Sequence, residues 1–377
     1  MKGKRLLYIV NSADFFMSHR LPLALAAMKR GFDVHVAVGE GGGEALEAHN
    51  VKCYTIPLTR SGRGLATEIR CFLSVFRLLR KLKPDVVHMI TIKPVVYGGI
   101  AARMLLIKGR AFAIPGLGFV FLSKGFRAKF LRALIGQLYK LALGGSGVRI
   151  IFQNPDDLQL FKKLRFLGRR AKYSLIRGSG VDLADYQAES EHEGFPVVCM
   201  AARLLKDKGV NEYFFAAQLL RQRGVTARFL LAGDIDPGNP ASISEQTLEA
   251  WKVSNVLEIL GYRRDISNLF ASSSIVVLPS YREGLPKVLL EAAACGRAVV
   301  TTDVPGCRDA IEPNVTGLLV PACDSVALAD AIQRLIENPE LRQRMGQAGR
   351  ELAEREFGIE RVIDQHMTIY RELGDSR

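Results

Sequence analysis

Short apolar runs alternate with amphipathic stretches along the whole chain, and this pattern predicts an α/β fold. The apolar runs have the length of buried strands. A helix is expected over residues 19–30, ended by Gly31, and another over 213–223. Because strands and helices alternate, we expect parallel, doubly wound sheets. Strands are expected at residues 6–10, 34–38, 86–89, 197–200, 228–232, 256–259, 275–278 and 298–301.

The chain changes character at residues 182–194, which are polar and acidic and lack apolar periodicity. We therefore expect a linker at residues 182–195, between domains at 1–181 and 196–355. A length of 377 residues also favours two domains over a single core. The simplest assembly is two Rossmann-like domains, each a doubly wound parallel sheet, that face a central cleft.

The net charge of +14 favours anionic partners such as nucleic acid, phosphorylated small molecules or an anionic membrane. The six cysteines are scattered without a Cys-x-x-Cys pair, which argues against a zinc site and favours reduced thiols in the cytosol. The apolar run at residues 6–10 is too short for a signal peptide. Because no run of about 20 apolar residues occurs, no membrane-spanning helix is expected.

Basic residues are concentrated in a long interval without acidic side chains, between Asp85 and Asp156. Within it, apolar residues recur every four positions over residues 119–143, which predicts a basic amphipathic helix. Such a helix could lie on an anionic bilayer, or it could be a solvated helix packed on the first domain. The residues expected at a membrane are Lys124, Arg127, Lys129 and Arg132.

Two carboxylates eight positions apart, Glu283 and Glu291, are the most informative chemical feature. A strand is expected just before them, Pro286 suits the first turn of a helix, and Gly296 suits its end. Glu283 is therefore expected in the loop beyond the strand and Glu291 inside the helix. Ligands of open α/β sheets bind beyond the carboxyl ends of the strands, where both carboxylates could accept hydrogen bonds from hydroxyls of one ligand.

Arg203 and Lys208 follow the first strand of the second half, five positions apart. A guanidinium offers a planar fork of donors and an ammonium offers a compact charge. The two could neutralise a diphosphate as negative charge grows on it. A solvated loop with ordinary surface charge is the alternative. The glutamate pair in the same half of the chain favours the functional interpretation.

Glycine stands near two other strand ends. Gly233 ends a strand, where its missing side chain would let a ligand approach the backbone. Gly306 precedes an expected helix whose free amides attract anions, although helix capping explains this segment equally well. Asp234 and Asp236 form an Asp-x-Asp, but nothing nearby in the sequence supplies further ligands, so we expect no metal there.

In the first half, polar and aromatic residues follow the first strand and face the predicted cleft. His19 could contact substrate or stand at the start of a helix. His88 could contact substrate, or it could be a structural histidine. No Gly-x-Gly-x-x-Gly or Walker motif occurs, which argues against dinucleotide and P-loop proteins. The candidate residues of this half are Asn11, Phe15, Ser18, His19, His88, Lys93 and Gly116.

Taken together, these segments resemble the family-4 retaining glycosyltransferases of GT-B fold. The similarity covers nearly the whole chain and rests on the Glu-x7-Glu pair together with residues 202–209 and 231–234. Residues 152–154 and 178–182 resemble family segments at the domain junction. Two further segments, 15–22 and 115–118, resemble the bacterial branch that builds capsule, O-antigen or protein-linked glycans on a polyprenyl diphosphate carrier.

The resemblance implies a role for each candidate. Arg203 and Lys208 would hold the donor diphosphate, Glu291 the ribose hydroxyls, and Glu283 the hydroxyls of the donor sugar. The first-half candidates would bind the acceptor, and residues 356–377 would form a helix that crosses back to the first domain. The implied catalytic residues are Glu283, Arg203 and Lys208, and the implied donor-binding residues are Gly233, Gly284, Leu285, Pro286, Glu291 and Gly306.

Two departures from the family pattern limit these implications. Ser12, Ala13 and Asp14 stand where many relatives carry a glycine pair, so diphosphate contacts from that loop are not expected. Pro115 and Gly116 stand where many relatives carry a histidine near the donor sugar. Sugar contacts credited to that histidine would have to come from elsewhere or be absent.

The implied reaction transfers a sugar, with retention, from a nucleoside-diphosphate sugar to a lipid-linked saccharide. Uridine diphosphate and an N-acetylhexosamine are favoured by the branch resemblance alone. No cofactor or metal ion is expected, because Arg203 and Lys208 would stabilise the leaving diphosphate. Front-face attack and double displacement by a carboxylate nucleophile remain alternatives.

The expected partners are a nucleotide sugar, a polyprenyl-diphosphate-linked saccharide and an anionic membrane surface. The expected location is cytoplasmic, on the inner face of the cell membrane. A nucleotide-sugar epimerase of the same fold is the alternative function. A non-catalytic protein that binds nucleic acid is less well supported, because stacking aromatics on a sheet are not evident. We therefore expect no nucleic-acid partner.

Overall fold

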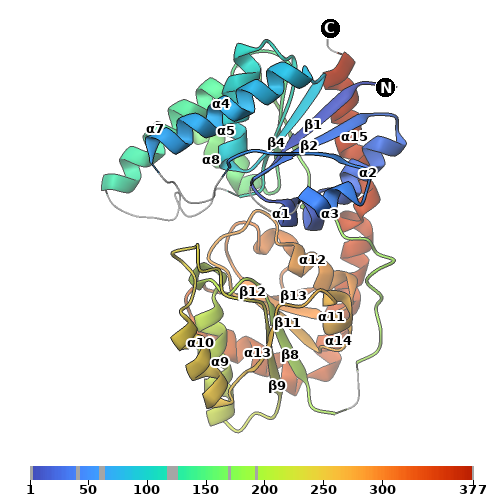
Figure 1. Cartoon of the computed structure of the whole chain (residues 1–377). Helices are drawn as coiled ribbons and strands as arrows, with labels where there is room; N and C mark the ends of the chain where they lie inside the picture. Colours follow the sequence, from blue (N-terminus) through green and yellow to red (C-terminus); the bar gives the residue numbers. More distant parts are fainter. Residues whose placement is uncertain are drawn as a thin grey trace. The chain divides into compact units, whose positions relative to one another are not determined.

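The computed structural model describes residues 3–39, 43–58, 64–116, 126–168, 171–191 and 194–375, without the side chains of 126–132. The chain forms two compact units (Figure 1). Unit 1 comprises Met1–Ser179 together with Glu360–Arg377, and unit 2 comprises Gly180–Ile359. The chain therefore passes between the units twice, once in each direction.

Unit 1 is built on a parallel sheet whose strands follow the order β3-β2-β1-β4-β5-β6-β7 over the described residues. Its central strands β1, β4 and β5 are almost wholly buried, as expected for a parallel sheet covered on both faces. The strands are β1 Arg5–Ile9, β2 Asp33–Val38, β3 Lys52–Thr55, β4 Val86–Ile90, β5 Gly109–Ile114, β6 Val148–Phe152 and β7 Lys172–Leu175.

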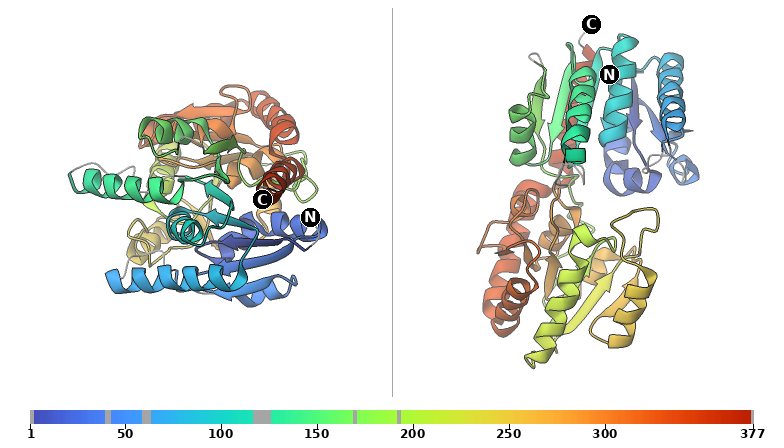
Figure 2. Two further views of the ribbon diagram at one scale, coloured as in Figure 1. Left: turned by 90° about the horizontal axis from the view of Figure 1, so that it is seen from above. Right: turned by 90° about the vertical axis from the view of Figure 1, so that its left-hand side faces the viewer.

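Helices cover both faces of this sheet (Figure 2). On one face, α5 packs against α4 and against α7 over a core that includes Leu7 and Met89. Side chains alternate along a strand. Tyr8 therefore points to the other face, where it contacts Tyr370 of α15. The helices are α1 Ala13–His19, α2 Leu21–Lys29, α3 Gly43–Glu47, α4 Leu65–Leu82, α5 Ile92–Met104, α7 Phe126–Ala142, α8 Pro155–Lys163 and α15 Ile359–Asp375.

Unit 2 repeats this architecture with strands in the order β10-β9-β8-β11-β12-β13, again parallel throughout. Helices α9 and α10 share one face, where Phe214 stacks on Trp251, and α12 packs against α14. The strands are β8 Val197–Ala201, β9 Arg228–Ala232, β10 Glu258–Gly261, β11 Ile275–Leu278, β12 Ala298–Thr302 and β13 Gly317–Val320. The helices are α9 Val210–Gln222, α10 Glu245–Ser254, α11 Ile266–Ala271, α12 Lys287–Ala294, α13 Ser325–Glu337 and α14 Pro339–Leu352, with short turns at Lys206–Lys208, Arg308–Ala310 and Ala353–Phe357.

The predicted doubly wound parallel sheets are confirmed, and each predicted strand overlaps an observed one. The strand order reverses between β1 and β4 in unit 1 and between β8 and β11 in unit 2. Such switch points are where ligands of open α/β sheets bind. Among the described helices, none is both long enough and apolar enough to cross a bilayer.

Two local expectations differ from the structure. The helix expected over 19–30 begins instead at Leu21 as α2, where Pro22 suits the first turn, and His19 is the last residue of the preceding helix α1. Residues 182–191, expected as a linker, belong to unit 2 and are bonded to it. Glu191 accepts hydrogen bonds from Arg342, and the Glu189 carbonyl accepts one from Arg297.

A buried polar cluster joins α15 to the sheet of unit 1. His88 of β4 is hydrogen-bonded to the Tyr370 hydroxyl at 2.6 Å, and the His366 ring lies 5.6 Å from the His88 ring. Arg20 is only 2% exposed beside these rings. Burial, and then the Arg20 charge, lower the pKa of His366 to about 3, and burial lowers the pKa of His88 well below its usual value. Both imidazoles are therefore neutral inside unit 1.

This cluster predicts acid sensitivity. Below about pH 6.5 the unfolded chain binds protons at both histidines, whereas the folded state does not. Stability is therefore fully present above pH 6.5 and falls as the pH drops, by about 2 kcal/mol at pH 5 from His366, and His88 adds to the loss in the same direction. In urea titrations, His366→Gln should remove about 2 kcal/mol of this pH-dependent loss at pH 5, although the variant is less stable at pH 7.

The control is His49→Gln, which removes an exposed imidazole in the turn after α3. Equal pH slopes for the wild type and His366→Gln would contradict the assignment of a buried neutral imidazole.

Candidate active site in unit 2

The loops at the carboxyl edge of the unit 2 sheet bring the predicted donor-site residues together. Arg203 and Lys208 follow β8, and Glu283 follows β11, its neighbour across the switch point. Pro286 precedes the first residue of α12, Glu291 lies inside this helix, and Gly296 follows it with φ 66°. The local structure expected around the two glutamates is therefore confirmed.

Three glycines allow these loops to pack closely. A Cβ on Gly209 would lie 2.2 Å from the carbonyl oxygen of Pro279, and one on Gly306 would lie 2.5 Å from that of Glu283. A Cβ on Gly233 would meet the carbonyl oxygen of Ala202 at 1.8 Å. All three residues have positive φ, which other residues rarely adopt.

The structure gives Gly233 and Gly306 a role in loop packing that was not expected from the sequence. The close approach that requires Gly233 is to the neighbouring loop of the protein itself. The Gly306 amide donates to the Asp309 carboxylate at 2.9 Å, and the helix expected after it is only the turn Arg308–Ala310. For Gly306, capping and loop packing therefore explain the sequence without an anion.

Lys208 and Glu283 form an ion pair at the switch point. The Lys208 Nζ donates to Glu283 Oε1, and the Ser280 hydroxyl donates to the same oxygen at 2.8 Å. The Glu283 amide donates to the Pro305 carbonyl at 3.0 Å, which fixes the backbone below the carboxylate. Gly284, Leu285 and Pro286 continue from it as a buried segment into α12. Both partners are largely covered, with 20% and 13% of their side chains exposed.

Arg203 lies at the same edge but pairs with a different carboxylate. Its Nη1 donates to Asp236 Oδ2 at 2.8 Å. Half of the Arg203 side chain is exposed, so it can reach a ligand in solvent. Asp236 belongs to the Asp-x-Asp after β9, and this guanidinium is one of its partners.

Glu291 is 7% exposed and is held by two neighbours. The Tyr186 hydroxyl donates to Glu291 Oε1 at 2.5 Å, and Lys287 Nζ lies 2.8 Å from the same oxygen. Burial, and then the Glu291 charge, raise the pKa of Tyr186, so that its phenol stays a neutral donor. Sequence reasoning missed Tyr186, because it lies in the segment expected to be a linker.

The candidates of unit 1 divide between surface and core. Asn11 follows β1, and α1 carries Phe15, Ser18 and His19, with the Phe15 and His19 rings stacked at 4.5 Å. The Ser18 hydroxyl lies 2.7 Å from His19 Nδ1. These residues remain candidates for substrate contact.

His88 does not fit that role. Its side chain is fully buried and is bonded to Tyr370, so the structural histidine that the sequence left as the alternative is favoured. Lys93, near the start of α5, pairs with Glu68 at 2.8 Å. Gly116 follows β5 with φ 141°. Thr91, between β4 and α5, has φ 75°, which is unusual for a β-branched residue and marks the switch point of unit 1 as strained.

The membrane candidates fall outside what the structure describes. Lys124 precedes the described part of α7, and the side chains of Arg127, Lys129 and Arg132 are not described. The helix α7 itself, Phe126–Ala142, is present, as the apolar spacing predicted.

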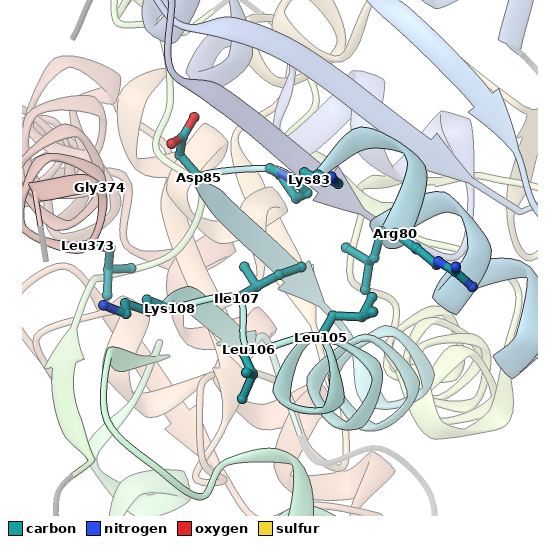
Figure 3. Close-up of a pocket in the computed structure, with 11 residues that line it drawn as sticks. Arg80, Lys83, Asp85, Leu105, Leu106, Ile107, Lys108, Leu373 and Gly374 are labelled. Atoms are coloured by element: carbon teal, nitrogen blue, oxygen red, sulfur yellow. The ribbon is translucent and has the colours of Figure 1, made fainter. Parts of the chain in front are cut away.

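A separate hollow of about 460 Å³ lies in unit 1 at the edge where β4 and β5 begin (Figure 3). Lys83, Asp85 and Lys108 line it together with Leu106 and Leu373. The ends of α4 and α5 lie here, and cations at helix C-termini are accounted for by the helix dipole. This hollow is at the edge opposite the switch point, so we do not assign the active site to it.

The sequence matches two families of sugar-transferring enzymes. Residues 184–352 match "Glycosyl transferases group 1", and residues 5–154 match "Glycosyl transferase 4-like". A Campylobacter jejuni N,N'-diacetylbacillosaminyl-diphospho-undecaprenol alpha-1,3-N-acetylgalactosaminyltransferase is 30% identical over 349 residues, 87% of this chain and 90% of that protein. An Escherichia coli UDP-Gal:alpha-D-GlcNAc-diphosphoundecaprenol alpha-1,3-galactosyltransferase is 23% identical, over 91% and 89% of the two chains.

Solved structures agree on the fold. A sucrose-phosphate synthase from Thermosynechococcus elongatus superposes with a TM-score of 0.80 at 20% identity, over 99% of this chain and all of that one. HepE of Anabaena, in complex with UDP and glucose, gives 0.77 at 20% identity, over 98% of this chain and 100% of the other. Fold and sequence thus define a glycosyltransferase of GT-B fold. The chain belongs to the group 1 glycosyl transferases.

The close approach at Gly306 predicts that a larger residue there displaces the loop that carries Glu283. Gly306→Ala would place a Cβ against the Glu283 and Gly284 carbonyls at a left-handed φ, so the loop carrying Glu283 must shift. We expect a loss of about 1–3 kcal/mol in the free energy of unfolding, together with reduced sugar transfer. Chemical denaturation and an activity assay measure the two effects.

Gly238→Ala is the matched control, because a Cβ there meets no atom within 4 Å. Equal stability of the two variants would show that the close approach at Gly306 does not constrain the loop.

Proposed function

We propose that this enzyme transfers an N-acetylhexosamine, with retention, from a UDP-linked donor to a saccharide on a polyprenyl diphosphate. One observation carries the proposal: Lys208 and Glu283 meet at the switch point of unit 2, with Arg203 on the neighbouring loop at the same edge. Two relatives whose names specify undecaprenol-diphosphate acceptors support the acceptor class. HepE, with bound UDP, supports the donor nucleotide.

In the proposed reaction, the bond between the anomeric carbon and the diphosphate oxygen breaks, and the acceptor hydroxyl oxygen bonds to that carbon. The hydroxyl proton passes to the leaving phosphate. Negative charge grows on the diphosphate during this step, and Arg203 and Lys208 stabilise it. No protein group has to attack the sugar when the acceptor approaches from the side of the leaving group.

Glu283 holds the donor sugar in this proposal. Its carboxylate accepts hydrogen bonds from Lys208 and Ser280. A carboxylate neutralised in this way is a weak nucleophile but a well-positioned acceptor for sugar hydroxyls. This engagement supports front-face attack over double displacement. Glu291 would bind the ribose hydroxyls and share its carboxylate with Tyr186.

We further propose that unit 1 supplies the acceptor contacts. Asn11, Phe15, Ser18 and His19 lie at or beside the loop after β1, one of its two switch-point strands, and Lys93 and Gly116 follow β4 and β5. The basic stretch around Lys124 would approach the anionic membrane that holds the lipid acceptor. The membrane part of the proposal rests on the sequence and on the names of the relatives.

The proposal predicts that Arg203→Ala and Lys208→Ala each lower kcat by about 100- to 1,000-fold, because one charged donor to the transition state is lost. The assay incubates UDP-N-acetylhexosamines with a synthetic polyprenyl-diphosphate saccharide and detects the extended product by mass spectrometry. Lys206→Ala removes an exposed cation from the same turn and is the control. Conversion of the donor without the acceptor would instead indicate an epimerase.

Membrane attachment has its own test. Replacing Lys124, Arg127 and Lys129 by Glu should lower binding to anionic vesicles by on the order of 100-fold, since each basic residue near such a surface contributes about 1 kcal/mol. Sedimentation with phosphatidylglycerol vesicles measures the change. The matched triple variant replaces Lys162, Lys163 and Arg165, which are exposed on and after α8. An equal loss of vesicle binding in the two variants would show that binding depends only on the net charge of the protein.

A further inference from the structure

Each of the two cations proposed to hold the diphosphate forms an ion pair with a carboxylate of the protein itself. For Lys208 this carboxylate is Glu283, which already has a role in the proposed reaction. For Arg203 it is Asp236, which has none. A negative group placed on a diphosphate-binding cation has a direct energetic consequence, because the diphosphate and the carboxylate compete for the same N–H donors.

Asp236 is placed beside Arg203 by an ordered loop. Its amide donates to the Ser242 hydroxyl at 2.9 Å, and its carbonyl accepts from the Asn239 amide at 2.8 Å. Leu205 and Ser242 form an antiparallel bridge. The loop after β9 therefore lies along the loop after β8, and the carboxylate is presented to the guanidinium by backbone bonds on both loops.

We propose that the Asp236 carboxylate competes with anionic ligands for the Arg203 guanidinium. An anion must displace this carboxylate before it can bind Arg203. This inference rests on the proposed function. A diphosphate that also contacts Lys208 can replace the carboxylate. Displacing the carboxylate costs the same free energy for every anion that binds Arg203, so inorganic phosphate, which has fewer other contacts, is left with less net binding. Asp236 thus lowers the affinity for anions through Arg203, and a ligand with further contacts is needed to overcome it.

An ordinary orienting salt bridge makes the opposite prediction. If Asp236 served to hold Arg203 in a productive rotamer, its neutralisation would free the side chain and weaken diphosphate binding. If Asp236 competes, neutralisation strengthens binding. Asn is nearly isosteric with Asp and keeps the Asp236 backbone bonds, so the sign of the change separates the two roles.

The experiment measures dissociation constants of UDP, inorganic pyrophosphate and inorganic phosphate by calorimetry. Asp236→Asn should tighten UDP and pyrophosphate by about two- to fivefold, the range of an exposed ion pair. Inorganic phosphate should gain by a similar factor, and high salt should reduce every gain. Asp234→Asn removes the same charge from an exposed position two residues away and should change affinity less.

The same measurements in an Arg203→Gln background complete the test. The gain from Asp236→Asn should disappear there, because the contested donors are gone. An unchanged or weaker affinity of Asp236→Asn for UDP, or a gain that persists without Arg203, would overturn the inference. If Arg203→Gln itself leaves diphosphate affinity unchanged, the proposed clamp fails and the inference falls with it. If Arg203→Gln weakens binding but Asp236→Asn does not strengthen it, only the inference falls.

Discussion

Glycines at three points of close backbone approach allow the loops after β8, β9, β11 and β12 to lie against one another. Parallel strands send all these loops to one edge of the sheet, but shared direction alone does not bring them into contact. At Gly209, Gly233 and Gly306, a carbonyl oxygen occupies the space of a side chain. The positions of Lys208, Arg203 and Glu283 all follow from this packing.

Each of the charged side chains named at this edge is paired with a neighbour of opposite charge. Lys208 is covered by Glu283, Arg203 by Asp236, and Glu291 by Lys287. Each pair avoids leaving a partly buried ion without a counter-charge. A ligand that bears both phosphates and hydroxyls can replace the partners in these pairs. Its phosphates accept hydrogen bonds from the cations, and its hydroxyls donate hydrogen bonds to the carboxylates.

The sequence was sufficient for features set by local pattern. Strand positions follow from apolar runs, and the positions of Glu283 and Glu291 follow from the strand before them and from Pro286 and Gly296. Contacts between distant segments could not be predicted. Tyr186 reaches Glu291 across 105 positions, and the polar segment that carries it has no periodicity to indicate packing.

His88 and Gly233 show a second limit of sequence reasoning. A histidine at a strand end and a glycine after a strand have the same local signature whether they serve a ligand or the fold. Only burial against Tyr370, and the nearness of the Ala202 carbonyl, separate the two cases. The membrane residues of the basic stretch remain a prediction.

Unit 1 takes its strands from one end of the chain and α15 from the other. During synthesis, residues 360–377 leave the ribosome after the whole of unit 2. Until then, Tyr8, His88 and Arg20 lack the cover that His366 and Tyr370 provide. Unit 2 can finish folding first, while the part of unit 1 that was synthesised earlier still exposes these polar side chains. Proteases and chaperones therefore have the longest access to the segment that was made earliest.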